Sequence, residues 1–199
     1  MTDAYAPPAF ARPFHFLRHG QTTYNRDGIF QGQIDSPLSD AGVAQAEAAA
    51  QALQGEPIRR IVASPLSRAR LTAEAAGRVL GLPVHTDDGL KECHLGVHQD
   101  QPHATWPLNL YWRGEVVPEG GESFGDFRAR VLSAMARLTA EEDGVLIVAH
   151  GGLWQSLLSA FRVRSTLSAM PNALPLHLTP GEVWQVRLIG EARAAGAQV

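Results

Sequence analysis

The chain has 199 residues, of which 45% are hydrophobic and 19% charged, with a formal net charge of −3 and one cysteine. This composition excludes a disordered or fibrous chain and argues against a nucleic acid or an anionic membrane as partner. A single cysteine excludes an internal disulfide, which fits a reducing compartment, so the cytoplasm is the expected location. We find neither a signal-peptide pattern nor an apolar run near the roughly 20 residues that span a bilayer. We expect one domain over 1–199, with a loose leader at 1–13 and a tail at 191–199.

Patterns typical of strands and helices alternate from the N-terminus onward. Phe14–His19 predicts a strand that ends at a glycine. A helix is expected over 39–53, with an apolar stripe at Val43, Ala46, Ala50 and Leu53. Ile61–Ala63 predicts a second strand, and Ser64 is the expected N-cap of a helix that ends near residue 80.

The alternation continues in the second half of the chain. Val84–Thr86 predicts a third strand, and the Ser-x-x-Asp pattern at 123–126 predicts the start of a long helix. The apolar stripe of that helix is Phe124, Phe127, Val131, Ala134 and Leu138. Val145–Ala149 is wholly apolar, as in a buried central strand, and a helix follows it to Phe161. Trp184–Leu188 alternates and predicts a last strand near an edge. The pattern predicts an α/β fold, a three-layer sandwich with a mostly parallel sheet and helices on both faces.

Three predicted strands end in turns that carry basic or histidine side chains. The turns are Arg18-His19-Gly20, Ser64–Arg68 and His150-Gly151-Gly152. Ligands of open α/β sheets bind beyond the carboxyl ends of the strands, and helix N-termini attract anions there. If these strands are neighbours, two arginines and two histidines converge on one spot.

Such a cluster suits a phosphate group. Arginine binds phosphate oxygens with two parallel hydrogen bonds and keeps its charge, and a neutral histidine is nucleophilic near pH 7. Transfer of a phosphoryl group depends mainly on positioning and charge stabilisation, so it needs no metal here. We expect no cofactor and a small phosphate ester as the partner.

Five ordered blocks carry a family resemblance, which runs from about residue 14 to 160. The first is Leu17–Thr22, followed by Asn25, Gln31-Gly32, Asp35, Leu38, Gly42 and Gln45-Ala46. The others are Ser64–Ala69 with Thr72-Ala73, Leu90–Glu92 with Gly96, Gly120–Ser123 and Val148–Gly152. With these blocks the chain resembles the histidine phosphatase superfamily, which has the phosphoglycerate mutase-like fold.

The resemblance implies a role for each matching residue. His19 would attack phosphorus and carry the phosphoryl group, and Glu92 would protonate the leaving alcohol and later activate water. The phosphate oxygens would be bound by Arg18, Asn25, Arg68, His150 and Gly151. The implied activity is a metal-independent phosphomonoester hydrolase of a small phosphorylated metabolite.

Two features of the segment after Glu92 bear on the substrate. Phosphatases of the family often have an aromatic-Glu-Gly triplet where this chain has His98-Gln99-Asp100. Further on, the aromatic residues Trp106, Tyr111 and Trp112 line a substrate pocket in one interpretation and form the core of a loop cap in the other. Arg113 is a candidate contact for a second anionic group.

Other candidate groups have simpler interpretations. Asp87, Asp88 and Glu122 are rivals to Glu92 as the acid. Cys93, His94 and His98 invite a metal hypothesis, but their spacing does not give four ligands, so we expect no metal site. His15 and His177 are expected to be packing residues.

Two other functions remain in competition with hydrolysis. A cofactor-dependent phosphoglycerate mutase needs extra basic residues after the acid, whereas Gln99–Pro118 offers only Arg113. A non-catalytic phospho-ligand or protein-binding member of the fold would have lost the nucleophile, the acid or an arginine. A homodimer is an open alternative for the assembly.

Overall fold

The computed structural model describes residues 7–190, which form one seven-stranded sheet in the order β3-β2-β4-β1-β6-β7-β5. The strands are β1 (Phe14–Arg18), β2 (Arg60–Ala63), β3 (Val84–Thr86), β4 (Val145–Ala149), β5 (Val163–Arg164), β6 (Pro175–Thr179) and β7 (Trp184–Leu188). β6 runs antiparallel to β1 and β7, and the other neighbouring pairs are parallel. The predicted mostly parallel sheet is confirmed.

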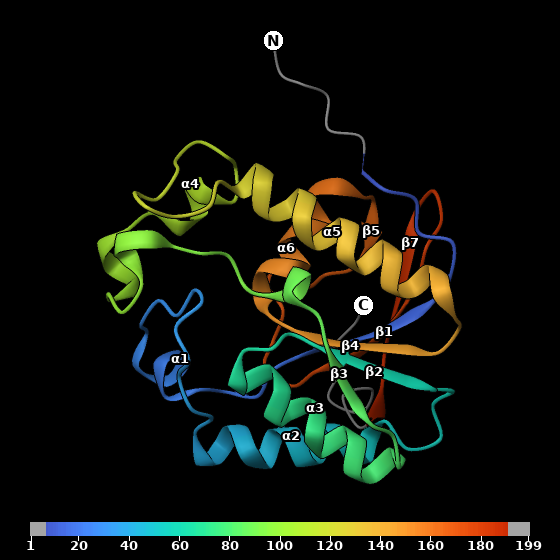
Figure 1. The fold of residues 1–199 in the computed structure, drawn as a ribbon. Coiled ribbons are helices and arrows are strands. Elements are labelled where there is room, and N and C mark those ends of the chain that lie inside the picture. Colours follow the sequence, from blue (N-terminus) through green and yellow to red (C-terminus); the bar gives the residue numbers. More distant parts are fainter. Residues whose placement is uncertain (1–6, 191–199) are drawn as a thin grey trace.

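Helices cover both faces of the sheet (Figure 1). One face carries α2 (Asp40–Ala52) and α3 (Ser67–Leu80), and the other carries α5 (Phe124–Glu141) and α6 (Gly151–Ala160). The fully buried β4 divides its side chains between the two cores. Val145, Ile147 and Ala149 pack with α5 and α6, whereas Leu146 and Val148 pack with α2 and α3. This alternation of side chains produces the three layers.

Short elements lie in the connections. They are α1 (Thr23–Asp27), α4 (Leu108–Tyr111) and the 3₁₀ turns η1 (Asp88–Leu90), η2 (Gly96–His98) and η3 (His103–Thr105). Figure 1 shows α1 and α4 at one end of the molecule, beyond the carboxyl ends of the central strands. These segments therefore surround the edge where the three predicted turns meet.

The start of α3 differs from the prediction. Ser64 was expected to cap this helix, but its hydroxyl accepts a hydrogen bond from Leu66 N at 3.3 Å, and the helix begins at Ser67. Asp35 Oδ1 accepts from Ser67 N at 2.7 Å. The first turn of α3 is thus completed by a carboxylate from a distant loop, which local sequence cannot reveal.

The buried face of α2 departs from the predicted stripe at one position: Ala46, Ala50 and Leu53 are buried as predicted, but Val43 is 50% exposed. Gly42 is buried in its place, and a Cβ on Gly42 would lie 1.8 Å from Gln21 O. A Cβ on Gly20 would likewise lie 2.3 Å from Gly42 O. The close approach of these two glycine backbones determines how the start of α2 packs against the turn that follows β1.

Several other predictions hold. The predicted stripe of α5 is buried, and Ser123 Oγ accepts from Asp126 N at 3.1 Å at the start of that helix. β7 lies second from the edge, beside β5. Part of the predicted leader is packed, because Phe10 lies edge-on against the rings of Phe161 and Trp184. The predicted tail at 191–199 lies outside the described residues.

Candidate active site

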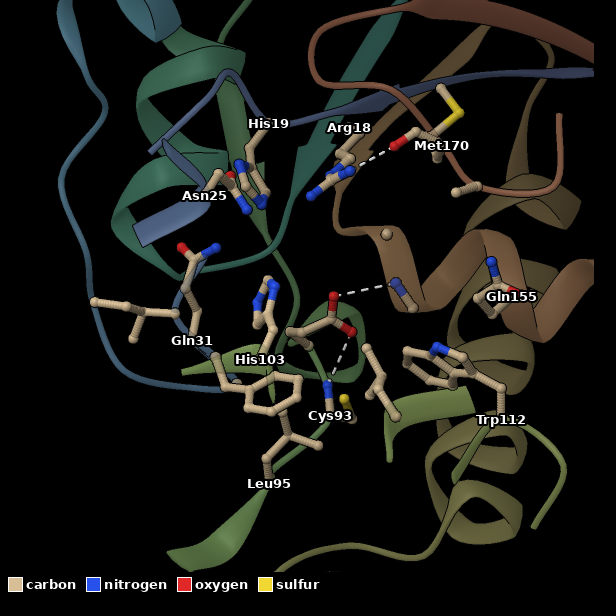
Figure 2. A pocket seen from close by; sticks show the side chains of 18 of the residues that line it. Arg18, His19, Asn25, Gln31, Cys93, Leu95, His103, Trp112, Gln155 and Met170 are labelled. Atoms are coloured by element: carbon tan, nitrogen blue, oxygen red, sulfur yellow. Dashed lines mark hydrogen bonds between the residues drawn. The ribbon is translucent and has the colours of Figure 1, made fainter. Parts of the chain in front are cut away.

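The three turns converge, because β2, β4 and β1 are neighbours in the sheet. Figure 2 shows the pocket at their carboxyl ends. Of the seven site residues predicted from sequence, six line it: Arg18, His19, Asn25, Arg68, Glu92 and Gly151. The seventh, His150, is fully buried directly beside His19, with the two ring centroids 5.3 Å apart.

His19 presents one ring nitrogen for chemistry. Its Nδ1 lies 2.7 Å from Gly20 O, and since a carbonyl oxygen only accepts, Nδ1 carries the proton in this hydrogen bond. The lone pair is then on Nε2. Burial lowers the pKa of His19 well below its usual value, and the charges of Arg68 and Arg18 lower it further. The ring is therefore a neutral base whose free nitrogen is available to attack an electrophile.

His150 is the N-cap of α6, and neither of its ring nitrogens has a hydrogen-bond partner. Burial is the main cause of its lowered pKa, and the charges of Arg68, Arg18 and Arg130 act in the same direction. An unpartnered buried ring costs free energy unless a ligand satisfies it. Its position beside His19 suits a contact with an anion held at that ring.

Two guanidinium groups, of the buried Arg68 and the half-buried Arg18, flank the histidines. Arg18 donates from Nη1 to Met170 O at 2.5 Å, and Arg68 donates to Ile34 O at 2.8 Å and to Gly32 O at 2.7 Å. The Nε atoms of both arginines are buried without a partner. Burial lowers the pKa of Arg68 to about 10, so the group stays charged near pH 7. The site therefore concentrates positive charge for an anion.

Glu92 lies between η1 and η2, and its carboxylate is held by two backbone amides. Oε2 accepts from Gly152 N at 3.1 Å, at the start of α6, and Oε1 accepts from Cys93 N at 3.0 Å. A Cβ on Gly152 would lie 2.2 Å from Glu92 Oε1. The glycine thus gives the carboxylate the space in which it meets the helix terminus.

Asn25 is held by a residue that sequence reasoning missed. Asn172 Nδ2 donates to Asn25 Oδ1 at 3.3 Å and to His19 O at 2.9 Å. Asn25 Oδ1 also accepts from Thr22 N at 3.2 Å. The Asn25 oxygen is thereby engaged, which leaves its amide hydrogens for a ligand in the pocket.

The outer pocket wall is mostly apolar and contains further residues that the sequence analysis did not select. They are Ile29, Phe30, Gln31, Leu95, His103, Leu108, Gln155, Ala169 and Met170. Figure 2 places His103 and Gln31 on one side of the pocket and Gln155 and Trp112 on the other. His103 carried no signal in the sequence, but its ring lies 4.6 Å from that of Phe30.

The aromatic residues after Glu92 serve both proposed purposes. Trp112 lines the pocket, whereas Tyr111 is fully buried in the core of the cap beside Trp106. Arg113 does not line the pocket; it is exposed and lies 3.8 Å from Glu115. The candidate contact of Arg113 with a second anionic group therefore finds no support in the structure.

The unusual triplet His98-Gln99-Asp100 packs beside the site. The His98 ring stacks on Trp106 at 4.5 Å, and Gln99 Oε1 accepts from Gln33 N at 2.8 Å. Asp100 accepts from Tyr24 OH at 2.7 Å. The triplet thus supports the loops around the pocket without lining it.

The rival acids are engaged elsewhere. Asp87 caps η1 and pairs with Arg137, Asp88 pairs with Lys91, and Glu122 pairs with Arg130. None of the three carboxylates lines the pocket. Within residues 7–190, no three His, Cys, Asp or Glu side chains are grouped as a metal site requires.

The two site histidines predict a pH dependence of stability. Their folded-state pKa values lie below the unfolded value of about 6.5, so the unfolded chain binds more protons as the pH falls. Stability is thus full well above pH 6.5 and declines progressively as the pH falls below it. His15 and His177, packed elsewhere, also have lowered pKa values and act in the same direction.

Urea unfolding at pH 7.5 and 5.5 measures this dependence. We expect the wild type to lose stability at the lower pH, and His19→Ala to lose less because one of the groups is gone. Equal stability of the wild type at both pH values would contradict the assignment of neutral buried histidines.

Comparison with known proteins agrees with this geometry. A glucosyl-3-phosphoglycerate phosphatase of Mycolicibacterium vanbaalenii is 38% identical over 196 residues, which cover 90% of this chain and 85% of the relative. Its Mycobacterium tuberculosis counterpart is 41% identical over 167 residues, which cover 75% of each. A solved mycobacterial glucosyl-3-phosphoglycerate phosphatase with VO₃ superposes with a TM-score of 0.76 at 37% identity, over 89% of this chain and 97% of that one.

The family assignment follows from a match over most of the chain. The model of the histidine phosphatase superfamily (branch 1) covers residues 14–188. Over the part of the chain that the structure describes, no helix combines the length and apolarity needed to cross a bilayer. The chain belongs to branch 1 of the histidine phosphatase superfamily, and its sequence motifs predicted the superfamily.

Proposed function

We propose that this protein is a metal-independent phosphomonoester hydrolase that works through a phosphohistidine at His19. The observation that carries the proposal is the orientation of His19. Its Nδ1–H is bound to Gly20 O, which leaves the Nε2 lone pair in the same pocket as the buried Arg68 and the half-buried Arg18. A nucleophile and the charges that stabilise a phosphoryl group thus lie in one pocket.

The proposed reaction has two steps. His19 Nε2 attacks phosphorus, the bond to the ester oxygen breaks, and protonated Glu92 gives its proton to the departing alcohol. Water then attacks the phosphohistidine, the P–N bond breaks, and Glu92 recovers a proton from that water. Inorganic phosphate leaves and the histidine is regenerated. Arg18, Arg68, Asn25, His150 and the Gly151 backbone would hold the non-bridging oxygens in both steps.

The charges of the pocket support hydrolysis rather than mutase transfer. Among the described residues that line the pocket, Arg18 and Arg68 are the only arginines and there is no lysine. Both arginines are placed to bind the phosphate that is transferred. A bisphosphate would therefore meet no second pair of cations. The nucleophile, the acid and both arginines are present, which disfavours a purely binding role.

The outer wall supports a sugar-bearing substrate. Trp112 offers a flat apolar surface, and Gln155 and His103 carry polar groups that suit hydroxyls. Glucosyl-3-phosphoglycerate, which the similar mycobacterial enzymes are named for, is thus the first ester to test. Its carboxylate would share Arg18 or face solvent, because the outer wall adds no arginine or lysine within the described residues.

Phosphate release in the presence of EDTA tests the proposal. The panel contains p-nitrophenyl phosphate, glucosyl-3-phosphoglycerate, glycerol 3-phosphate and 3-phosphoglycerate, and the assay also monitors conversion to 2-phosphoglycerate. We expect EDTA-resistant release of phosphate without phosphoglycerate interconversion. Loss of turnover in EDTA that added metal restores would refute metal independence, and interconversion faster than release would favour a mutase.

A further inference from the structure

A fully occupied guanidinium lies outside the pocket, behind the segment that carries Glu92. Arg130 is on α5, and its Nε and Nη2 donate to Glu122 Oε1 and Oε2 at 2.9 and 2.8 Å. Its side chain is only 28% exposed. The two parallel hydrogen bonds fix the plane of the guanidinium, which the flexible ammonium of a lysine could not do in the same way.

The remaining donors of Arg130 hold the backbone around the acid. Nη1 donates to Gly89 O at 3.0 Å and to Lys91 O at 3.1 Å, and Nη2 lies 3.5 Å from Glu92 O. With the two bonds to Glu122, all five N–H groups have an acceptor. Three of the five acceptors are carbonyls of the four residues that end at Glu92.

The packing around this segment leaves little alternative space. η1 packs against α5, where a Cβ on Gly89 would lie 2.5 Å from the Ala134 Cβ. At the far end, the carboxylate of Glu92 meets Gly152 N. The acid is thus held between two helices, by Arg130 through its backbone and by the start of α6 through its carboxylate.

We propose that Arg130, oriented by Glu122, is a positioning residue that sets where the Glu92 carboxyl meets the leaving oxygen of the substrate. Arg130 does not line the pocket, so it acts through Glu92. The inference rests on the proposed function, because it takes Glu92 as the general acid. A displacement of about 1 Å in a reacting group can lower the rate by about 10²-fold, so loss of the Arg130 contacts should have a measurable effect.

The test uses two esters that differ in their need for an acid. p-Nitrophenolate leaves as a stable anion, whereas the alkoxide of an alkyl phosphate such as glycerol 3-phosphate needs a proton. The quantity is the ratio of kcat/KM for the two esters, which reports departure of the leaving group. The amount of folded enzyme cancels in this ratio, so a loss of stability alone does not change it.

We expect Arg130→Met to lower kcat/KM for the alkyl ester by about 10²-fold more than for p-nitrophenyl phosphate. Arg130→Lys should show most of the same loss, because lysine keeps the charge but lacks the planar guanidinium that donates two parallel hydrogen bonds. Arg137→Met is the matched control: Arg137 is on the same helix and pairs with Asp87, but does not touch the carbonyls of 89–92. Its ratio should stay within twofold of the wild type.

Glu92→Gln distinguishes the role of Glu92 as the general acid from the role of Arg130 in positioning it. If its loss is selective for the alkyl ester but that of Arg130→Met is equal for both esters, the positioning role is wrong and the proposed function stands. If Arg130→Lys had the wild-type ratio of kcat/KM for the two esters, the proposal that the planar guanidinium positions Glu92 would also be wrong. If Glu92→Gln affects both esters equally, Glu92 is not the acid, and its proposed role and the positioning role of Arg130 both fall, whereas hydrolysis through His19 is decided by His19→Ala.

Discussion

We expect His19→Ala to lower kcat/KM for p-nitrophenyl phosphate by about 10⁴-fold or more, because the variant lacks the atom that receives the phosphoryl group. The other phosphate ligands stay in place. Binding of inorganic phosphate should therefore weaken far less than turnover. Steady-state kinetics and calorimetric titration with phosphate measure the two effects separately.

Folding is the necessary control for this variant. His19 is buried but adjoins an open pocket, so we expect its truncation to leave the cooperative thermal transition intact. A variant that folds normally and keeps more than a hundredth of the wild-type activity would show that His19 is not the nucleophile.

The second large effect is expected at Arg68. Arg68→Met removes a charge from the site and leaves the carbonyls of Gly32 and Ile34 without their donor. Loss of one group that stabilises a developing charge costs about 10²–10³-fold in rate. The unsatisfied carbonyls should lower the free energy of unfolding by about 1–3 kcal/mol. Kinetics and urea unfolding of the same preparation measure both losses.

Arg70→Met gives the matched comparison, because it removes a neighbouring arginine of α3 that pairs with Glu74 at the surface. An exposed pair contributes about 0–1 kcal/mol, so this variant should resemble the wild type in both assays. If Arg68→Met and Arg70→Met were equally active, the assignment of Arg68 to the phosphate site would fail.

The meeting of the histidine-bearing turns could be predicted from sequence, because neighbouring parallel strands end at the same edge of a sheet. The apolar run of β4 and the glycine after β1 mark where two strands stop. Neighbouring parallel strands then bring His19 and His150 together whatever the loops do. The same reasoning predicts the α5 stripe, since a helix against a sheet needs one continuous apolar face.

Contacts between distant loops could not be predicted in this way. Asn172, Met170 and Gln155 reach the pocket or the groups around it from the region after β4, and the loop 165–174 has no strand or helix period. At the start of α2, the contact between Gly20 and Gly42 leaves Gly42 buried and the predicted Val43 exposed. Hydrophobic periodicity does not encode such backbone contacts.

The short cap elements show the same limit. Three prolines and several aromatic residues in Gln99–Pro118 indicate a loop-rich region, but not which ring faces the pocket. Trp112 faces it and Tyr111 is buried, although the two are adjacent. Composition does not distinguish these adjacent aromatic residues, so only the folded structure decides.

Trapping of the covalent intermediate tests the central claim most directly. The enzyme is mixed with a radiolabelled phosphate ester, denatured within milliseconds and digested, and the labelled peptide is sequenced. We expect label that is stable in alkali, lost in acid and located on His19, with none in His19→Ala. Turnover without covalent label, or label that persists in His19→Ala, would contradict it.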